Sequence, residues 1–141
     1  MWIAYGDETA SGGENVTLWR RPAGQPDFAG PYRVSPLPAR QFAPDVEIDS
    51  QGRAHVVWVD KRAGTHVYYG IFDAAAGETV LEVRISETSG SYFRPSLALD
   101  SQGRAHVLYE ESVSAIPPER SDLWFATTAP KTAARGWMRY R

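Results

Sequence analysis

The sequence predicts an all-β chain that is built from repeated antiparallel units. The eleven residues 48–58 return at 99–109 with Asp-Ser-Gln-Gly-Arg-Ala-His in common, and Asp49 recurs as Asp100, a repeat of 51 residues. A period near 50 residues indicates a repeat architecture. Short stretches rich in β-branched and aromatic residues alternate with turns that contain Gly or Pro, which is typical of successive strands. Apolar residues nowhere keep helical spacing for more than one turn, so we expect essentially no helix.

The first unit contains three expected strands, which are short and rich in apolar residues: 1–5, 16–19 and 32–35. Residues 35–43 follow as an expected connection between units. Pro36 and Pro38 favour this interpretation, because proline cannot donate to a strand ladder.

Each of the next two units contains four expected strands. In the second unit they are 46–48, 54–59, 67–72 and 81–86, and in the third they are 97–99, 105–110, 123–126 and 137–141. The stretch 54–59 is apolar apart from one histidine, so we expect it to be covered on both faces. Between the first two strands of each unit lies an Asp-x-x-Gly turn. The aspartate can accept backbone hydrogen bonds there and the glycine can adopt a positive φ, so these residues are expected to be structural: Asp49, Gly52, Asp100 and Gly103.

Four consecutive antiparallel strands make one blade of a β-propeller. The sequence thus predicts a propeller segment of three blades at 1–35, 42–86 and 93–141, with the first blade lacking its inner strand. Closed propellers have about four to eight blades, so additional blades or a second copy of the chain are needed to close a ring. We expect a longer chain, because the first blade would lack its inner strand even in a dimer. The end blades should then leave apolar side chains uncovered: Trp2, Ile3, Leu18, Leu108, Trp124 and Phe125.

The blade motif resembles a known family. Residues 93–109 read Phe-Arg-Pro-Ser-Leu-Ala-Leu-Asp-Ser-Gln-Gly-Arg-Ala-His-Val-Leu-Tyr, and Arg-Val/Ile-Ser ends the first two blades. This pattern resembles the sialidase-like propellers, whose blades are described as BNR or Asp-box repeats. Propellers of the NHL type share the Asp-x-x-Gly hairpin but usually have shorter blades. The Asp-box, which is structural in the family, is not intact here, and 73–79 and 136–137 resemble remnants of it.

The resemblance implies that one face of the blades, lined by the loops between blades and between second and third strands, holds the ligand. The ligand-face candidates are Arg94, Arg40, Asp60, Arg62, Glu110 and Glu111, with Asp7 and Glu8 at the equivalent loop of the first blade. Of the family's catalytic groups only Arg94, in Phe-Arg-Pro, matches a motif position, and no catalytic residue is assigned. Arg94 could clamp a carboxylate or be an ordinary surface arginine. Paired acids could serve glycosidic acid/base chemistry, but we prefer to interpret them as a solvated loop rim.

Two groups of residues could bind a metal or stack against a sugar, but structural roles explain both groups better. His55 and His106 occupy the same place in neighbouring blades with no third ligand nearby, so we expect buried, hydrogen-bonded histidines rather than a metal site. The aromatic residues at blade-packing positions are expected to be core rather than a sugar platform: Trp58, Tyr69, Phe72, Tyr109 and Phe125.

Composition narrows the possible partners. The net charge of −2 gives no basic field, so no nucleic acid is expected. No apolar run is long enough to span a membrane. The chain has no cysteine, and no metal or cofactor is predicted.

The sequence therefore favours a sialidase-like propeller segment that acts as a glycan- or protein-binding scaffold. An extracellular or periplasmic location in a bacterium is expected. The alternative is part of an exo-acting, sialidase-type glycoside hydrolase whose catalytic site is completed by missing blades. A purely architectural repeat array is a third possibility.

Overall fold

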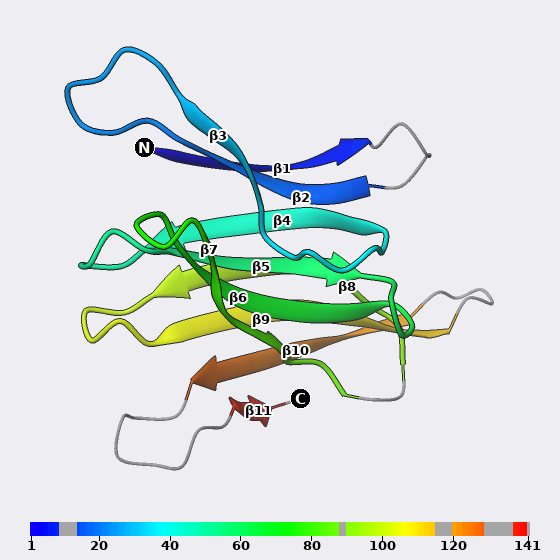
Figure 1. Ribbon diagram of the computed structural model, residues 1–141. Helices are drawn as coiled ribbons and strands as arrows, with labels where there is room; N and C mark the ends of the chain where they lie inside the picture. Colours follow the sequence, from blue (N-terminus) through cyan, green and yellow to red (C-terminus); the bar gives the residue numbers. More distant parts are fainter. Residues whose placement is uncertain (9–13, 88–89, 115–119, 129–136, 141) are drawn as a thin grey trace.

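A computed structural model describes the backbone of residues 1–8, 14–87, 90–114, 120–128 and 137–140. Within these ranges the chain forms eleven strands and no helix, and the strands make three antiparallel sheets (Figure 1). Three strands form the first sheet and four strands form each of the other two. The all-β prediction and the expected grouping of the strands are confirmed.

The strands of each sheet follow one another in chain order. The first sheet consists of β1 (Trp2–Glu8), β2 (Glu14–Arg20) and β3 (Ala29–Arg33). The second consists of β4 (Gln41–Ile48), β5 (Ala54–Asp60), β6 (His66–Asp73) and β7 (Glu78–Arg84). The third consists of β8 (Tyr92–Leu99), β9 (Ala105–Ser114), β10 (Arg120–Thr128) and β11 (Trp137–Tyr140).

The three sheets lie face to face in an open stack with the second sheet in the middle (Figure 1). One apolar cluster fills the space between the first and second sheets and includes Leu18 and Trp58. A second cluster lies between the second and third sheets and includes Val57 and Tyr109. All seven residues of β5 are buried, as expected for a strand covered on both faces. Alternate side chains of β5 therefore enter different clusters.

The first strands of the second and third sheets, β4 and β8, begin earlier than the sequence indicates. Residues 41–43 belong to β4, so the expectation that the whole of 35–43 is a connection is wrong. A β-bulge accommodates Pro44, because the register with β5 shifts between Phe42 and Asp45 and the bulged Ala43 has φ of 50°. The same shift recurs in β8 around Arg94, which also has φ of 50°. Each of these strands lies at the edge of its sheet, where proline is tolerated.

The Asp-x-x-Gly turns have the geometry expected from the sequence. Gly52 and Gly103 have φ of 79° and 72°, and each donates its N–H to the carbonyl of the aspartate three residues earlier. A side chain at these positions would be strained by the left-handed backbone alone, since an added Cβ would meet no other atom within 4 Å. The turn assignment and the strand register are confirmed.

The outer faces of the stack differ in part from expectation. Ile3 on β1 and Leu108 on β9 are 42% and 45% exposed, as expected for uncovered faces. Leu18 and Trp124, however, point into the stack, where Leu18 is fully buried and Trp124 packs on the second cluster. Trp2 also points inward, where it is half-buried against the first cluster. The expectation for these three is wrong because strand alternation directs them inward. Phe125 lies beside Trp124 in sequence and faces the opposite way.

Candidate functional site

The strand register places the candidate residues at two ends of the sheets. At one end, which we call the rim, Gln41 of β4 pairs with Asp60 of β5, and Phe93 of β8 pairs with Glu110 of β9. At the other end the same strands are joined by the turns that begin at Asp49 and Asp100. The ligand-face candidates therefore come from the rim end, and the Asp-x-x-Gly turns come from the opposite end.

Arg94 stands out from the rim on its bulge. Its Nη1 lies 2.8 Å from Oε2 of Glu110, and its side chain is 78% exposed. An exposed ion pair of this kind stabilises the fold little, so the pair is free to open toward a ligand. In the second sheet the same bulge carries Ala43, which has no functional group. The rim therefore changes its chemistry from one repeat to the next while the backbone stays the same.

Arg40 and Lys61 extend the rim over the second sheet. The Nε of Arg40 lies 2.6 Å from Oε2 of Glu14 on β2. The guanidinium of Arg40 and the ammonium of Lys61 lie 5.3 Å and 5.8 Å from the ring centroid of Phe42. Phe42 is half-buried, and both cations lie within cation–π distance of its ring. This arrangement combines an aromatic surface with charged hydrogen-bond donors.

Asp60 lies inside the stack, and Arg62 beside it is half-buried, so neither belongs to a solvated loop rim. Asp60 is fully buried, and its carboxylate accepts hydrogen bonds from the N–H and the guanidinium of Arg62 and from the Trp58 indole, the last at 3.2 Å. Arg62 also bonds Glu82 of β7 and, at 3.1 Å, Ser35 after β3. The interpretation of this segment as a loop rim is therefore wrong for both residues. Sequence spacing could not reveal this, because Glu82 and Ser35 are distant in the chain.

The charges of this internal cluster stabilise one another. Burial raises the pKa of Asp60, but the hydrogen bonds from Arg62 outweigh burial and hold the pKa below its ordinary value. Hydrogen bonding to Asp60 raises the pKa of Arg62. The Nε of Arg62 is buried without a hydrogen-bond partner. The guanidinium lies 4.4 Å from the ring centroid of Tyr68, so the cation is also held against an aromatic face.

The two adjacent glutamates of β9 leave the strand on opposite sides. Glu110 turns to Arg94, whereas Oε2 of Glu111 accepts the Trp124 indole N–H at 2.8 Å. Consecutive strand residues point to opposite faces, so these two acids do not face each other across a common site. The side chains of Asp7 and Glu8 lie outside the described part of the structure. The paired-acid hypothesis thus has no geometric support at β9.

His55 is buried in a chain of polar groups. Its Nε2 lies 3.2 Å from Oδ2 of Asp49, and its Nδ1 lies 2.5 Å from the Tyr69 hydroxyl. Burial lowers the pKa of His55 and raises that of Tyr69, which favours the neutral form of both groups. The expectation of a buried, hydrogen-bonded histidine is confirmed here. Among the described residues there is no cluster of three or more His, Asp or Glu that could hold a metal ion.

His106 repeats only part of this arrangement. Its Nε2 lies 3.3 Å from Oδ2 of Asp100, but its ring stacks on Phe125, which takes the place of Tyr69. The side chain of His106 is 31% exposed, so the expected burial is wrong for this copy. The cause is its place on the outer face of the third sheet, which none of the described strands of the other two sheets covers.

We expect the protein to lose stability as the pH falls below about 6.5. Burial lowers the pKa of His55 and of His66, which is 2% exposed and contacts the Ala63 carbonyl. The unfolded chain then binds more protons than the folded one, so the free energy of unfolding rises with pH through this window. Above the pKa that histidine has in the unfolded chain, the two neutral histidines no longer reduce the free energy of unfolding. Urea titrations from about pH 5 to about pH 8 measure the slope. The double variant H55Q/H66Q should flatten this dependence of stability on pH. An unchanged slope would show that other groups cause the dependence.

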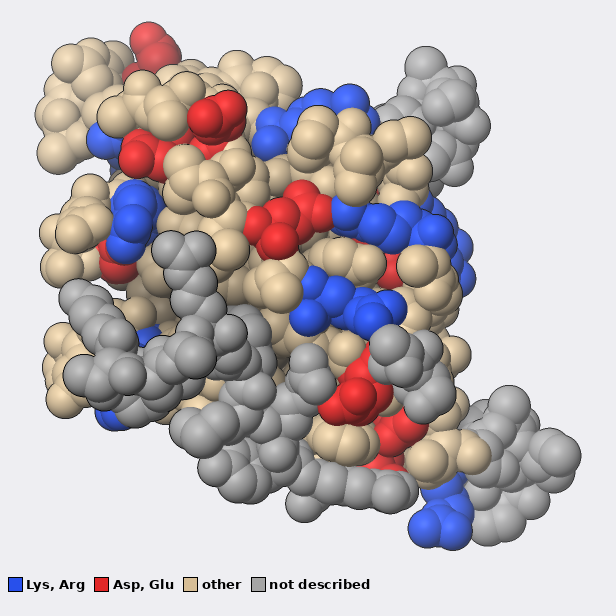
Figure 2. All heavy atoms as spheres, turned by 60° about the horizontal axis from the view of Figure 1, so that its bottom comes forward, with Lys and Arg blue, Asp and Glu red and all other residues tan. Residues whose placement is uncertain are grey.

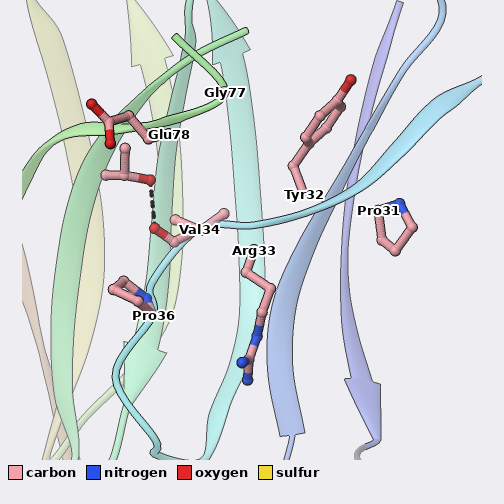
Figure 3. Close-up of a pocket in the computed structure, with 8 residues that line it drawn as sticks. Pro31, Tyr32, Arg33, Val34, Pro36, Gly77 and Glu78 are labelled. Carbon is pink, nitrogen blue, oxygen red and sulfur yellow. Dashed lines mark hydrogen bonds between the residues drawn. The ribbon is translucent and has the colours of Figure 1, made fainter.

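Two shallow hollows follow the seams between sheets. One lies between β3 and the start of β7, where the Thr79 hydroxyl donates to the Val34 carbonyl. Figure 3 shows Tyr32 and Arg33 pointing to opposite ends of this hollow, with Glu78 across from them. The other hollow lies between the two Asp-x-x-Gly turns. Neither gathers side chains that converge on a common point.

The surface charge is mixed. Figure 2 shows basic and acidic side chains interleaved over the face drawn, with uncharged surface between them. Such a surface differs from the continuous basic stripe that binds nucleic acid. No helix formed by the described residues is long and apolar enough to cross a membrane.

Comparisons with known proteins bear on the fold. No family model matches the chain, and no curated protein matches it. Among solved structures the chain is similar to an endo-1,4-beta-xylanase from Bacteroides thetaiotaomicron VPI-5482, with a TM-score of 0.56 and 13% sequence identity. The match covers 97% of this chain and 52% of that one, so the chain spans about half the length of the solved protein. At this identity the likeness concerns the all-β fold alone.

Proposed function

We propose that the chain is a three-blade segment of a sialidase-like β-propeller whose rim binds a glycan or a protein. The observation that carries the proposal is the regular stacking of the repeat. The first strands of the sheets, β1, β4 and β8, lie next to one another, and each later strand follows outward in chain order. Radial repetition of four-stranded antiparallel sheets around an axis is the propeller architecture. An extracellular or periplasmic location is part of this proposal.

The contrast between the two ends of the sheets supports a binding role for the rim. The turns at Asp49 and Asp100 make the same hydrogen bonds in both repeats. At the rim, by contrast, Ala43 is replaced by Arg94 on an equivalent bulge. Function is often carried by variable loops on a constant scaffold. The exposed cations and the half-exposed Phe42 suit a polar ligand that carries carboxylates, such as an acidic glycan or an acidic protein segment.

The alternative is a sialidase-type glycoside hydrolase whose site is completed by further blades. The xylanase described above is a glycoside hydrolase by name, which agrees with this reaction class without assigning it here. Most glycoside hydrolases use two carboxylates on opposite sides of the scissile bond, whereas sialidases use a tyrosine nucleophile. Glu110 and Glu111 leave β9 in different directions and are each already bonded, so this segment would contribute Arg94 rather than an acid pair.

Titration of the 141-residue chain with a panel of acidic and neutral oligosaccharides and acidic peptides tests the proposal by calorimetry. We expect an acidic ligand to bind and R94A to weaken binding about ten-fold, the loss of one charge-assisted contact. The matched control is Q102A, at an exposed turn residue of the opposite end, which should leave the affinity unchanged. Absence of binding across the panel, or binding lost in Q102A and kept in R94A, would overturn the proposal. Release of sugar from a fluorogenic glycoside would favour the hydrolase.

A further inference from the structure

Two exposed arginines of the rim are each held by a glutamate from another strand. Arg40 lies directly before β4, and its Nε lies 2.6 Å from Oε2 of Glu14 on β2. Arg94 lies on the bulge of β8, and its Nη1 lies 2.8 Å from Oε2 of Glu110 on β9. The side chains of the two arginines are 55% and 78% exposed. Both cations thus face solvent while an acid of the chain itself contacts each guanidinium.

The arginine and the glutamate of the third sheet occur together. In the second sheet the same two places hold Ala43 and Val59 instead of Arg94 and Glu110. Ala43 is exposed although the third sheet packs against the second, so the exposure of this place is a property of the bulge. The third sheet therefore adds a cation and its own acid at one point of a constant backbone.

The backbone next to Arg94 is fixed from the second sheet. Oδ2 of Asp45 on β4 accepts the N–H of Leu97 on β8 at 2.8 Å. On the other side of β4, Lys61 donates its N–H to the carbonyl of Arg40 at 3.0 Å. Arg40, Lys61 and Arg94 therefore lie on adjoining segments of one rim.

We propose that Glu14 and Glu110 compete with the ligand for the rim, so that an acidic ligand binds by replacing these carboxylates on the two arginines. This inference rests on the proposed function, because it concerns the same rim. Glu110 contacts Arg94 through Nη1, whereas a ligand carboxylate that accepts two parallel N–H bonds forms the stronger, bidentate contact. Each replacement opens an exposed ion pair, which contributes little to stability, so the chain keeps its fold when the pairs open.

Replacement of this kind selects for ligands that carry several carboxylates. A ligand with one carboxylate opens one pair and gains one contact. A chain of carboxylates opens both pairs in a single binding event and also meets Lys61 between them. Once its first carboxylate is bound, the second contact is intramolecular, so the affinity rises by much more than the number of carboxylates. The ligand class is therefore a chain of carboxylates.

Calorimetry with two probes tests the inference. Oligogalacturonate presents repeated carboxylates on a sugar backbone and oligoglutamate presents them on a peptide backbone, so the probe that binds more tightly assigns their source. For that probe we expect E14Q and E110Q each to raise the affinity about two- to five-fold, the contribution of one exposed ion pair. The probe should also bind at least about ten-fold more tightly than acetate, which carries a single carboxylate.

Two controls separate competition from net charge. E47Q removes the same charge at an exposed residue of β4 near the opposite end of the sheet, and it should leave the affinity unchanged. In the R94A background, E110Q should raise the affinity no further, because Glu110 then has no arginine to compete for. Circular dichroism and urea denaturation should show the same fold in every variant.

The outcomes distinguish this inference from the proposed function. Unchanged or weaker binding by E14Q or by E110Q would overturn it, since that glutamate would then have no part in binding or would hold its arginine ready for the ligand. A gain of the same size in E47Q, a gain from E110Q that persists in R94A, or a probe that binds no more tightly than acetate would also contradict it. Binding that R94A weakens and the glutamate variants do not strengthen leaves the proposed function standing. If neither the wild-type chain nor E14Q/E110Q binds either probe, both the proposed function and this inference are wrong.

Discussion

Replacing Asp60 by alanine is expected to lower the free energy of unfolding by about 3 kcal/mol, the lower end of the cost of breaking a buried ion pair. Asp60 is fully buried and accepts hydrogen bonds from Arg62 and from the Trp58 indole. Without it, Arg62 keeps Glu82 and Ser35 as hydrogen-bond partners and the ring of Tyr68 as a contact. The Trp58 N–H loses the acceptor it has in the cluster. The charge of Arg62 would then lie beside an apolar cluster with one counter-ion. Chemical denaturation followed by tryptophan fluorescence measures the change.

A double-mutant cycle with R62M separates the charge from the packing. The variant D60A/R62M carries neither charge, so it should be more stable than D60A alone. Arg62 is partly exposed, with a side chain 16% accessible, which is why the lower figure is expected. A loss below about 1 kcal/mol in D60A would show that the cluster behaves as an ordinary surface ion pair.

Replacing Asp49 by alanine is expected to cost about 2 to 3 kcal/mol, and the equivalent change D100A is expected to cost less. Each aspartate accepts hydrogen bonds from two backbone N–H groups, an arginine and a histidine. Burial alone would raise the pKa of Asp49, but these donors hold it at about 2. The side chains of Asp49 and Asp100 are 6% and 22% exposed, so water can replace the lost acceptor more readily at Asp100.

D49A and D100A can be compared directly, because both substitutions are made in the same chain. The turn sequence and its bonds are the same, and the main difference is whether another sheet covers the histidine. Urea denaturation of D49A and D100A under one set of conditions gives the two changes. Equal losses would show that the local turn bonds alone determine the effect and that burial of the histidine contributes nothing.

The strands and their grouping could be predicted from the sequence because they depend on local pattern. The repeat, the turn at Asp49 and Gly52, and the apolar stretch 54–59 each carry their own signal. The start of β4 could not be placed, because the bulge that admits Pro44 depends on pairing with β5. Proline near a strand end gives the same sequence signal whether the chain bulges or turns away.

The candidate site could be predicted only where a residue acts through its position at the end of a strand. Arg94 and Glu110 fall at the rim because the alternation of turns places them there. Asp60 and Arg62 fall in the same loop, yet their partners Glu82 and Ser35 draw them inward. A charged residue next to a buried strand can face either way, and the choice depends on partners that lie 20 or more residues away in the chain.

The position of the second sheet between two others has a consequence for how the chain opens. The main contacts join each sheet to its neighbours, so the stack behaves as a short one-dimensional array of coupled units. The first or third sheet can detach by breaking a single apolar cluster, and each can do so while the other stays in place. The second sheet can open only when both clusters are lost. Its central strand β5, buried along its whole length, should therefore be the last part of the chain to exchange its amide hydrogens with solvent.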